Sequence, residues 1–270
     1  MSKPRSNLVV RLISSVILLP MALFPMFRGG WWFWGLLTFF MGVATWEYVR
    51  LLRHHGYAVN YIFAILLTEA LLIDFFLSLD LTRPALALLL FVSLAWHVLL
   101  DRTPTKVENW LLPLAGALYI GWMSGHMLLM RALPGGGYLL FTAFGCTWLA
   151  DGGAYFVGRA WGTHHMAPQI SPKKTWEGYA GGIVTGVVGG AIIAGLGGLG
   201  WGHGALLGLL LAAMTPIGDL GISMIKREVG VKDTSNLIPG HGGILDRADS
   251  LLLTAIIGYY YFIWVMGIGL

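Results

Sequence analysis

Long apolar segments alternate with short polar stretches along the whole chain. A membrane-spanning helix needs about 20 mainly apolar residues, and nine segments approach or reach that length. They cover residues 12–27, 31–49, 60–79, 84–100, 109–130, 138–157, 178–200, 204–224 and 250–268. The pattern predicts an all-α integral membrane protein, a polytopic bundle of about nine transmembrane helices.

The composition supports a membrane protein. The chain is 57% apolar and 11% charged, whereas a soluble domain is about 45–50% apolar and about 25% charged. Its 38 glycines suit membrane helices, in which small residues let backbones approach closely. The basic and then apolar N-terminus resembles a signal peptide, but no small-residue cleavage site follows, so we interpret it as the first spanning helix.

Cationic residues indicate the orientation of these helices. With a cytoplasmic N-terminus, the inner loops carry 14 of the 17 Lys and Arg residues. The outer loops carry Arg28, Arg83 and Arg131. Since cytoplasmic loops are enriched in Lys and Arg, both long polar loops, 158–177 and 225–249, are expected on the cytoplasmic side.

Residues 219–250 concentrate charge between two apolar segments. If the preceding helix continues to about Arg227, three polar residues share one of its faces at i, i+4 and i+7. A second set follows at i, i+3 and i+4 at the start of the last helix. The two sets are Asp219, Ser223 and Lys226, and then Asp246, Asp249 and Ser250. Oxygen ligands of this kind suit Mg²⁺; the alternative is that Asp246 and Asp249 only cap a helix and match its dipole.

A His241-Gly242-Gly243 turn precedes the last helix. Glycines allow backbone N–H groups to approach a ligand closely, and a helix N-terminus favours anions. A phosphate cradle and a plain tight turn explain these residues equally well.

A second polar stretch includes Ser171, Lys173, Lys174 and Thr175. Pro172 is expected to begin a helix there, and lysines bind phosphate as point charges. The alternative is an ordinary cytoplasmic boundary, where lysines need no ligand. Asp151 lies deep in the 138–157 segment, where a buried structural aspartate is the competing interpretation.

These motifs resemble the signature of the phosphatidate cytidylyltransferases, also called CDP-diacylglycerol synthases. The signature reads Ser223-Met-Ile-Lys226-Arg227, Lys232-Asp233 and His241-Gly-Gly-Ile-Leu-Asp246-Arg247-Ala-Asp249. Residues 171–178 and 151–155 resemble two further family motifs. One departure is Ala248, where the family often has a bulkier apolar residue. The likeness is specific over roughly residues 145–255.

The resemblance implies an inner-membrane enzyme that makes CDP-diacylglycerol and pyrophosphate from CTP and phosphatidic acid, with Mg²⁺ and as a homodimer. No nucleic-acid partner is expected. Residues 1–137 would complete the fold, and 138–270 would form the catalytic region with a cytosolic-face site. Asp219, Asp246 and Asp249 would bind the metal, with Asp151 a lower-ranked ligand of a second cation. Lys226 is expected to join the three aspartates in catalysis. The expected substrate-binding residues are Ser171, Lys173, Lys174, Thr175, Ser223, Arg227, Lys232, His241, Gly242, Gly243 and Arg247.

Two other functions compete with this interpretation. A CDP-alcohol phosphotransferase also pairs aspartates around metal, but in a tight Asp-x-x-Asp-Gly cluster, whereas Ser250 follows Asp249 here. A transporter would carry acidic residues at mid-bilayer in glycine-broken segments, whereas this chain gathers its charges near one face and shows no inverted repeat. A flux assay without CTP would separate the transporter from the enzyme.

Overall fold

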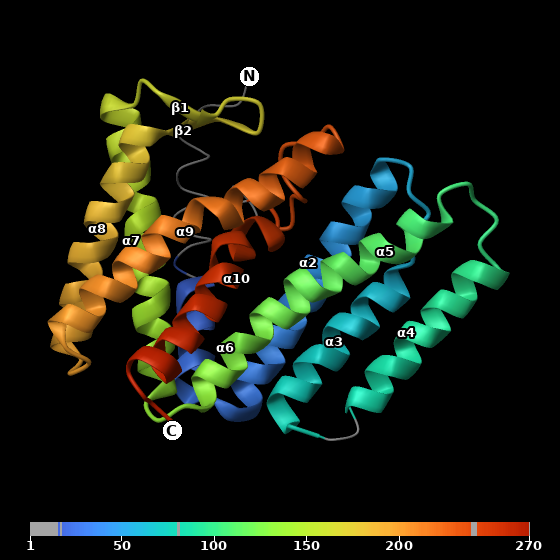
Figure 1. Ribbon diagram of the computed structural model, residues 1–270, viewed down its shortest axis with the longest axis horizontal. Helices are drawn as coiled ribbons and strands as arrows, with labels where there is room; N and C mark the ends of the chain where they lie inside the picture. The colour runs from blue at the N-terminus through green and yellow to red at the C-terminus, as the bar shows by residue number, and fades with distance from the viewer. Residues whose placement is uncertain (1–15, 17, 80–81, 239–241, 270) are drawn as a thin grey trace. The chain divides into compact units, whose positions relative to one another are not determined.

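The computed structural model describes residues 16, 18–79, 82–238 and 242–269. Over these residues the chain is helical, with one two-stranded hairpin (Figure 1). An apolar helix covers residues 18–28. The other elements are α2 (Gly30–His54), α3 (Tyr61–Leu77), α4 (Thr82–Leu99), α5 (Lys106–Ala117), η1 (Leu118–Trp122), α6 (Met123–Ala132), α7 (Gly136–Trp161), β1 (His165–Ala167), β2 (Ser171–Thr175), α8 (Trp176–Leu196), α9 (Trp201–Glu228), α10 (Leu245–Tyr260) and η2 (Tyr261–Val265). The helical fold is confirmed, and the hairpin is an addition to it.

Four helical stretches in the described part of the chain are long and apolar enough to cross a membrane. They are Lys106–Ala132, Trp176–Leu196, Trp201–Glu228 and Leu245–Val265. The chain is therefore a membrane protein by helix length and composition. The number of nine spans, the cytoplasmic N-terminus and the functional division at residue 137 stay predictions.

The chain forms two compact units. Unit 1 comprises Met1–Leu128 and Glu228–Ala248, and unit 2 comprises Leu129–Arg227 and Asp249–Leu270. The charged loop before α10 belongs to unit 1, whereas α9 and the hairpin belong to unit 2.

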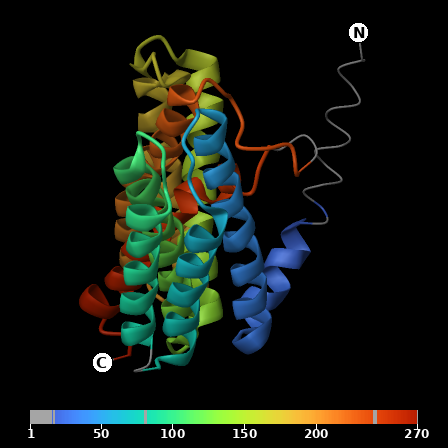
Figure 2. The same ribbon diagram turned by 90° about the vertical axis from the view of Figure 1, so that its right-hand side faces the viewer.

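In unit 1, α2 and α3 run side by side, and α3 also contacts α4 and α5 (Figure 2). Polar groups link these apolar helices. The Thr45 and Thr68 hydroxyls lie 3.0 Å apart between α2 and α3, and the Tyr48 hydroxyl donates to Leu112 O at 3.1 Å. Such hydrogen bonds between apolar helices fix their register, because a buried polar group without a partner is costly.

In unit 2, α8 packs closely against both α7 and α9. Its buried face repeats a small residue every four positions: Gly178, Gly182, Gly186, Gly190 and Ala194. A Cβ at Gly186 would lie 2.8 Å from Ala212 Cβ of α9 and 3.3 Å from Ala150 Cβ of α7. The spacing is the small-xxx-small pattern that permits close helix packing in membranes. The small residues let α8 pack closely against both α7 and α9. This packing positions α9, which carries Asp219, Ser223 and Lys226.

The hairpin corrects the expectation for Pro172, which lies in β2 and does not begin a helix. β1 and β2 pair antiparallel, and a two-stranded ribbon tolerates a proline because an edge strand has an unused N–H side. Helix α8 begins at Trp176 instead. Thr175 is its N-cap and accepts a hydrogen bond from Gly178 N at 3.2 Å. The hairpin lies at the ends of α7 and α8 (Figure 1).

Candidate active site

Helix α9 continues past Pro216 to Glu228, as the proposed polar face requires. Asp219, Ser223 and Lys226 therefore lie on one helix at i, i+4 and i+7, which is one face. Asp219 is half-buried, whereas Ser223 and Lys226 are 6% and 7% exposed. The Ser223 hydroxyl donates to Asp219 Oδ1 at 3.2 Å. The prediction of a continuous polar face on this helix is confirmed.

The hairpin brings a second predicted motif to the same face. Lys174 Nζ lies 2.6 Å from Asp219 Oδ2. Arg227 Nε donates to Ile170 O, in the turn between the strands, at 3.1 Å. Lys173, the neighbour of Lys174, is exposed. We call Lys174, Asp219 and Ser223 the Asp219 cluster; it joins residues 171–175 to residues 219–227, a connection that sequence spacing could not show.

Helices α9 and α10 approach each other at the level of Asp219. A Cβ added to Gly218 would lie 2.6 Å from Asp249 O and 3.2 Å from Ser250 Cα. Glycine is required there because the two backbones almost touch. Asp249 and Ser250 are 8% and 7% exposed, and Asp249 Oδ1 accepts from Ser250 N at 2.7 Å. The two helices therefore lie against each other at Gly218 and Asp249. That the Asp219 and Asp249 carboxylates share one metal stays a prediction.

In unit 1, the loop before α10 is organised around Glu47 of α2. Glu47 is completely buried, and its two carboxylate oxygens accept four hydrogen bonds of 2.5–3.0 Å. The donors are the hydroxyls of Thr234 and Ser235 and the amides of Ile244 and Leu245. Four donors fill the acceptor positions of a carboxylate, so Glu47 ties the loop and the start of α10 to α2.

Asp246 joins the same network. Its Oδ2 accepts from Thr234 N at 2.9 Å, from Thr234 Oγ1 at 2.9 Å and from Gly243 N at 3.0 Å. The Thr234 hydroxyl lies between the Asp246 and Glu47 carboxylates but carries one proton, so it donates to only one of them at a time. We call Glu47, Thr234, Ser235 and Asp246 the Glu47 network. The bond from Gly243 N supports the helix-capping alternative for Asp246.

The two glycines of the turn are required by this network. A Cβ at Gly243 would overlap the Thr234 hydroxyl and both Glu47 oxygens, and one at Gly242 would lie 2.8 Å from Asp246 Oδ2. Gly242 also has a φ of +83°, a conformation that glycine adopts readily. These contacts support the tight-turn interpretation, because the Gly243 amide already donates to Asp246. His241 lies outside the described residues.

The remaining predicted site residues lie in α7, in the hairpin, in the loop before α10 and in the first turn of α10. Thr175 is 6% exposed and caps α8, and Ser171 is half-buried in β2. Asp151, Lys232 and Arg247 are exposed. Their proposed roles stay predictions.

Sequence reasoning missed the position of Glu47 and the contributions of Thr234 and Ser235. An acidic residue in an apolar segment is a signal of function or pairing. That signal marks Glu47 in the sequence, but it names no partner. The partners lie 187–198 residues away in the chain, so only the fold brings them together.

The donor chemistry suits a hard divalent cation, although no cluster of three or more acidic, His or Cys ligands occurs among the residues that the structure describes. Mg²⁺ usually takes one or two carboxylates together with waters and substrate phosphates, so it needs no such cluster. Asp219 is half-buried at the edge of the hairpin and can serve as such a ligand. The residues therefore fit the metal by their chemistry.

Comparisons with known proteins agree with these motifs. The cytidylyltransferase family profile matches residues 9–265. The phosphatidate cytidylyltransferase of Brucella suis is 35% identical over 95% of this chain and 93% of its own length. That of Synechocystis is 33% identical over 95% of this chain and 97% of its own, and that of Mycobacterium bovis is 35% identical over 79% of this chain. The chain therefore belongs to the cytidylyltransferase family, as a relative of its phosphatidate cytidylyltransferases.

Proposed function

We propose that the Asp219 cluster and the start of α10 carry the transfer of a cytidylyl group from CTP to phosphatidic acid. The observation that supports this most is the 2.6 Å ion pair between Lys174 and Asp219, which joins two family motifs in one place. The phosphatidate oxygen attacks the α-phosphorus of CTP, a new P–O bond forms, and the bond to the β-phosphate breaks. CDP-diacylglycerol and pyrophosphate are the products.

The reaction needs little proton transfer. A phosphomonoester has a second pKa of about 6, so the attacking oxygen is largely ionised at neutral pH. What remains is to hold the two substrates in line and to neutralise phosphate charge. Lysine and arginine side chains supply that charge, and we assign it to Lys173, Lys174, Lys226 and Arg227.

Asp219 orients Lys174 through their ion pair, and Ser223 orients Asp219 by its hydrogen bond. An ammonium held by a half-exposed carboxylate can turn towards a phosphate with little change in burial, because both side chains are already partly exposed. Lys226 is buried on the same helix face, where its charge is screened less by salt. The α9 face therefore carries one buried cation, Lys226, and an aspartate that pairs with a partly exposed cation of the hairpin, Lys174.

The proposed metal ligands are Asp219, Asp246 and Asp249, with Asp151 for a second cation. A bound Mg²⁺ would supply charge stabilisation on the CTP phosphates. Asp246 is held by Thr234 and Gly243 and Asp249 by Ser250, so the two side chains keep their orientations without a metal. The proposed residues of the loop, Lys232, His241, Gly242 and Arg247, would contact the nucleotide phosphates, and Ser171 and Thr175 would bind substrate from the hairpin.

The proposal also includes the membrane topology, the side of the membrane on which the active site lies, and the oligomeric state. The chain would span the bacterial inner membrane nine times with its N-terminus and its active site on the cytoplasmic side, where CTP is available. The lipid tails of phosphatidic acid would enter from the bilayer. A homodimer is expected from the family.

The direct test is purified protein in detergent with radiolabelled CTP, phosphatidic acid and Mg²⁺. We expect a labelled, chloroform-soluble product that is lost with EDTA and in Asp249→Asn and Asp246→Asn. Since Asp246 also holds the Glu47 network, each variant is compared with Thr234→Ser, which keeps the hydroxyl, and its thermal unfolding is measured. No labelled lipid from folded wild-type protein would contradict the proposed function, and an active, Mg²⁺-dependent Asp246→Asn would contradict its assignment as a ligand.

A further inference from the structure

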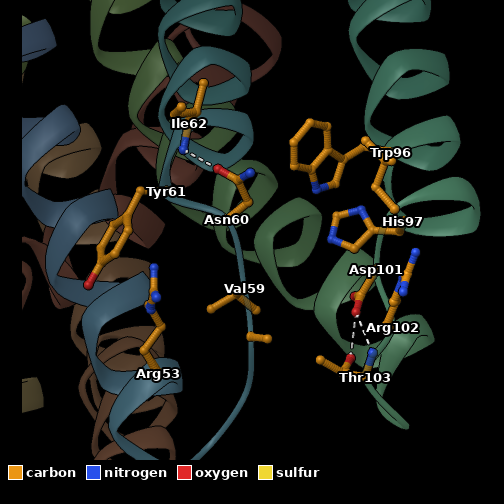
Figure 3. A pocket seen from close by; sticks show the side chains of 12 residues that line it. Arg53, Val59, Asn60, Tyr61, Ile62, Trp96, His97, Asp101, Arg102 and Thr103 are labelled. Carbon is orange, nitrogen blue, oxygen red and sulfur yellow. Dashed lines mark hydrogen bonds between the residues drawn. The ribbon is translucent and has the colours of Figure 1, made fainter.

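A polar cavity lies in unit 1 and shares no residue with the proposed active site. It has a volume of about 500 Å³ and lies between the end of α2, the start of α3 and the segment that follows α4 (Figure 3). The lining residues are Arg53, Ala58, Val59, Asn60, Tyr61, Ile62, Trp96, His97, Leu100, Asp101, Arg102 and Thr103. The cavity is therefore built from three separate segments near helix ends.

Two arginines give the cavity its charge. Arg53 and Arg102 line it, and neither forms an ion pair with any residue that the structure describes. The Arg53 guanidinium lies 5.0 Å from the centroid of the Tyr61 ring, a cation–π contact that holds the side chain in place and leaves its donors available to an anion. Guanidinium groups bind phosphate through paired N–H donors.

Asp101 is the one carboxylate in the lining of the cavity, and its oxygens accept hydrogen bonds from Thr103 and Asn109. Asp101 Oδ1 accepts from the Thr103 amide at 2.8 Å and from the Thr103 hydroxyl at 2.7 Å, and Asp101 Oδ2 accepts from Asn109 at 3.1 Å. The Thr103 hydroxyl and these other donors hold the pKa of Asp101 below its usual value. Two cations and one anion leave the lining with a net positive charge when His97 is neutral.

The remaining lining suits a group at a membrane boundary. Trp96 and Tyr61 face the cavity from opposite sides (Figure 3), and both residue types concentrate where headgroups meet water. His97 is buried at 4% exposure, and its Nδ1 lies 2.7 Å from Ser93 O, a contact in which the ring nitrogen donates. The apolar helix Arg83–Leu99 ends at the cavity, and the candidate span Lys106–Ala132 begins just after it.

We propose that this cavity is a binding site for a phosphate-bearing anion, with Arg53 and Arg102 as its cationic contacts. The ligand is a phospholipid headgroup or a soluble phosphate ester; both present the same anionic oxygens. The site would give the N-terminal helices a ligand-binding role apart from the proposed transfer reaction.

The test measures binding to full-length protein in zwitterionic detergent by native mass spectrometry. One arm titrates phosphatidylglycerol, an anionic lipid that is not the proposed substrate, with phosphatidylcholine as the uncharged comparison. The other arm titrates glycerol 3-phosphate as a soluble phosphate ester. Arg53→Gln/Arg102→Gln is compared with Arg28→Gln/Arg83→Gln, which removes the same charge from two exposed positions outside the cavity.

We expect one tight anion site in the wild type and in the Arg28/Arg83 control. In the Arg53→Gln/Arg102→Gln variant, the affinity should be at least about tenfold weaker than in wild type, a loss of about 1.4 kcal/mol. Lipid binding alone assigns the site to a headgroup, and glycerol phosphate binding assigns it to a soluble ester. Equal loss in both double variants, or no loss in either, would overturn the proposal.

Folding is controlled separately. Arg53→Lys/Arg102→Lys keeps the charge but removes the paired donors, and it is expected to bind more weakly than wild type and more tightly than the glutamine pair. Thermal unfolding of every variant is measured without ligand. If the lysine pair and the glutamine pair both unfold as wild type does and both bind the anion as tightly as wild type, the two arginines do not hold the anion and the proposal fails.

Discussion

Two groups of carboxylates in this protein show how differently the same side chain can be used. In the Glu47 network of unit 1, neutral donors surround a completely buried Glu47 and a half-buried Asp246. In the Asp219 cluster of unit 2, a half-exposed aspartate pairs with a lysine on a hairpin. The first arrangement has little freedom to exchange partners, because each hydrogen bond it loses leaves a buried group unpaired. The second can exchange its cation at low cost, because water solvates both partners.

The comparison suggests a division of labour. The Glu47 network holds the loop before α10, and the Asp219 cluster is the part of the molecule that we propose contacts the reacting phosphates. Substitutions of Glu47, Thr234 and Ser235 should therefore reduce stability, and substitutions in the cluster should reduce activity at nearly constant stability. Asp246 belongs to the network and is also a proposed metal ligand, so its substitution should reduce both.

Replacing Glu47 with Ala should give the largest loss of stability. Four donors lose their acceptor, and since each buried donor left unpaired costs about 1–3 kcal/mol, we expect a total loss of about 3–5 kcal/mol. We expect the thermal unfolding midpoint in detergent to fall by roughly 6–20 °C, from about 2–4 °C per kcal/mol for a chain of this size.

Glu69→Gln is the matched control for Glu47. Glu69 lies in α3, and its buried Oε2 has no hydrogen-bond partner among the described residues. Its replacement should move the midpoint little. A Glu47→Ala protein as stable as Glu69→Gln would show that the network does not hold the loop.

Replacing Lys174 with Met should lower the rate of CDP-diacylglycerol formation about 100-fold, which corresponds to about 2.7 kcal/mol of transition-state stabilisation. The stability change should stay within about 1 kcal/mol, because the side chains of the pair are 23% and 36% exposed and solvent screens their attraction. The assay is initial rate at saturating CTP together with thermal unfolding.

Exposed Lys173 provides the control for Lys174, since it carries the same charge next to it but has no part in the Asp219 pair. Lys173→Met should lose less activity. If the Lys174→Met enzyme unfolds at a much lower temperature than wild type, the Lys174–Asp219 ion pair stabilises the fold, as the Glu47 network is expected to do.

Replacing Gly243 with Ala should destabilise the protein by about 1–3 kcal/mol, because a Cβ there would overlap Thr234 and the Glu47 carboxylate. Gly35→Ala in α2 is the control, since nothing lies within 4 Å of a Cβ at that position. Chemical or thermal unfolding of the two variants side by side measures the difference. Equal stability would mean that the turn relaxes freely and does not depend on close packing.

Replacing Thr234 with Val keeps its shape but removes the hydroxyl that lies between the Glu47 and Asp246 carboxylates. A single hydrogen bond contributes about 1 kcal/mol, and a charged acceptor raises this to about 1.5–3 kcal/mol. We expect Thr234→Val to lose about 1 kcal/mol of unfolding free energy and Thr234→Ser to lose almost none. If the serine variant is as unstable as valine, the methyl group and not the hydroxyl holds the network.

The smallest effect is expected from pH at Asp101. Its pKa lies below the usual value, mainly because the Thr103 side chain donates to it. A lowered pKa in the folded state stabilises the protein above the unfolded-chain value of about 3.9, and this stabilisation disappears as the pH falls through the lower folded value. In a series of unfolding midpoints that starts at pH 7, the gap between wild type and Asp101→Asn should therefore hold down to about pH 3.9 and narrow below it. A constant gap would contradict the assignment.

Much of the fold could be predicted because membrane helices follow hydropathy. The segment 204–224 and the polar residues beyond it proved to be one helix, Trp201–Glu228, since Asp219, Ser223 and Lys226 keep the helical spacing. Pro172 was assigned wrongly because its preference for a first helical turn is also satisfied on a strand edge. The local pattern contains no signal that favours one of these over the other.

The site was predictable by residue type and motif, but its contacts were not. Lys174 and Asp219 lie 45 positions apart in the chain, and their ion pair depends on the turn of the hairpin and on where α9 ends. Glu47 and Leu245 are 198 positions apart, so the periodicity of a single helix or strand cannot pair them.

The sequence by itself determined that the chain is a helical membrane protein, which residues carry charge at the helix ends, and to which family the motifs belong. These depend on hydropathy, residue chemistry and short spacing, which are local properties. Only the tertiary structure decided that Glu47 holds the loop before α10 and that Lys174 faces Asp219. Such pairings are decided by packing among distant segments, where the loss of a buried hydrogen bond or the overlap of one Cβ atom costs enough to select one arrangement.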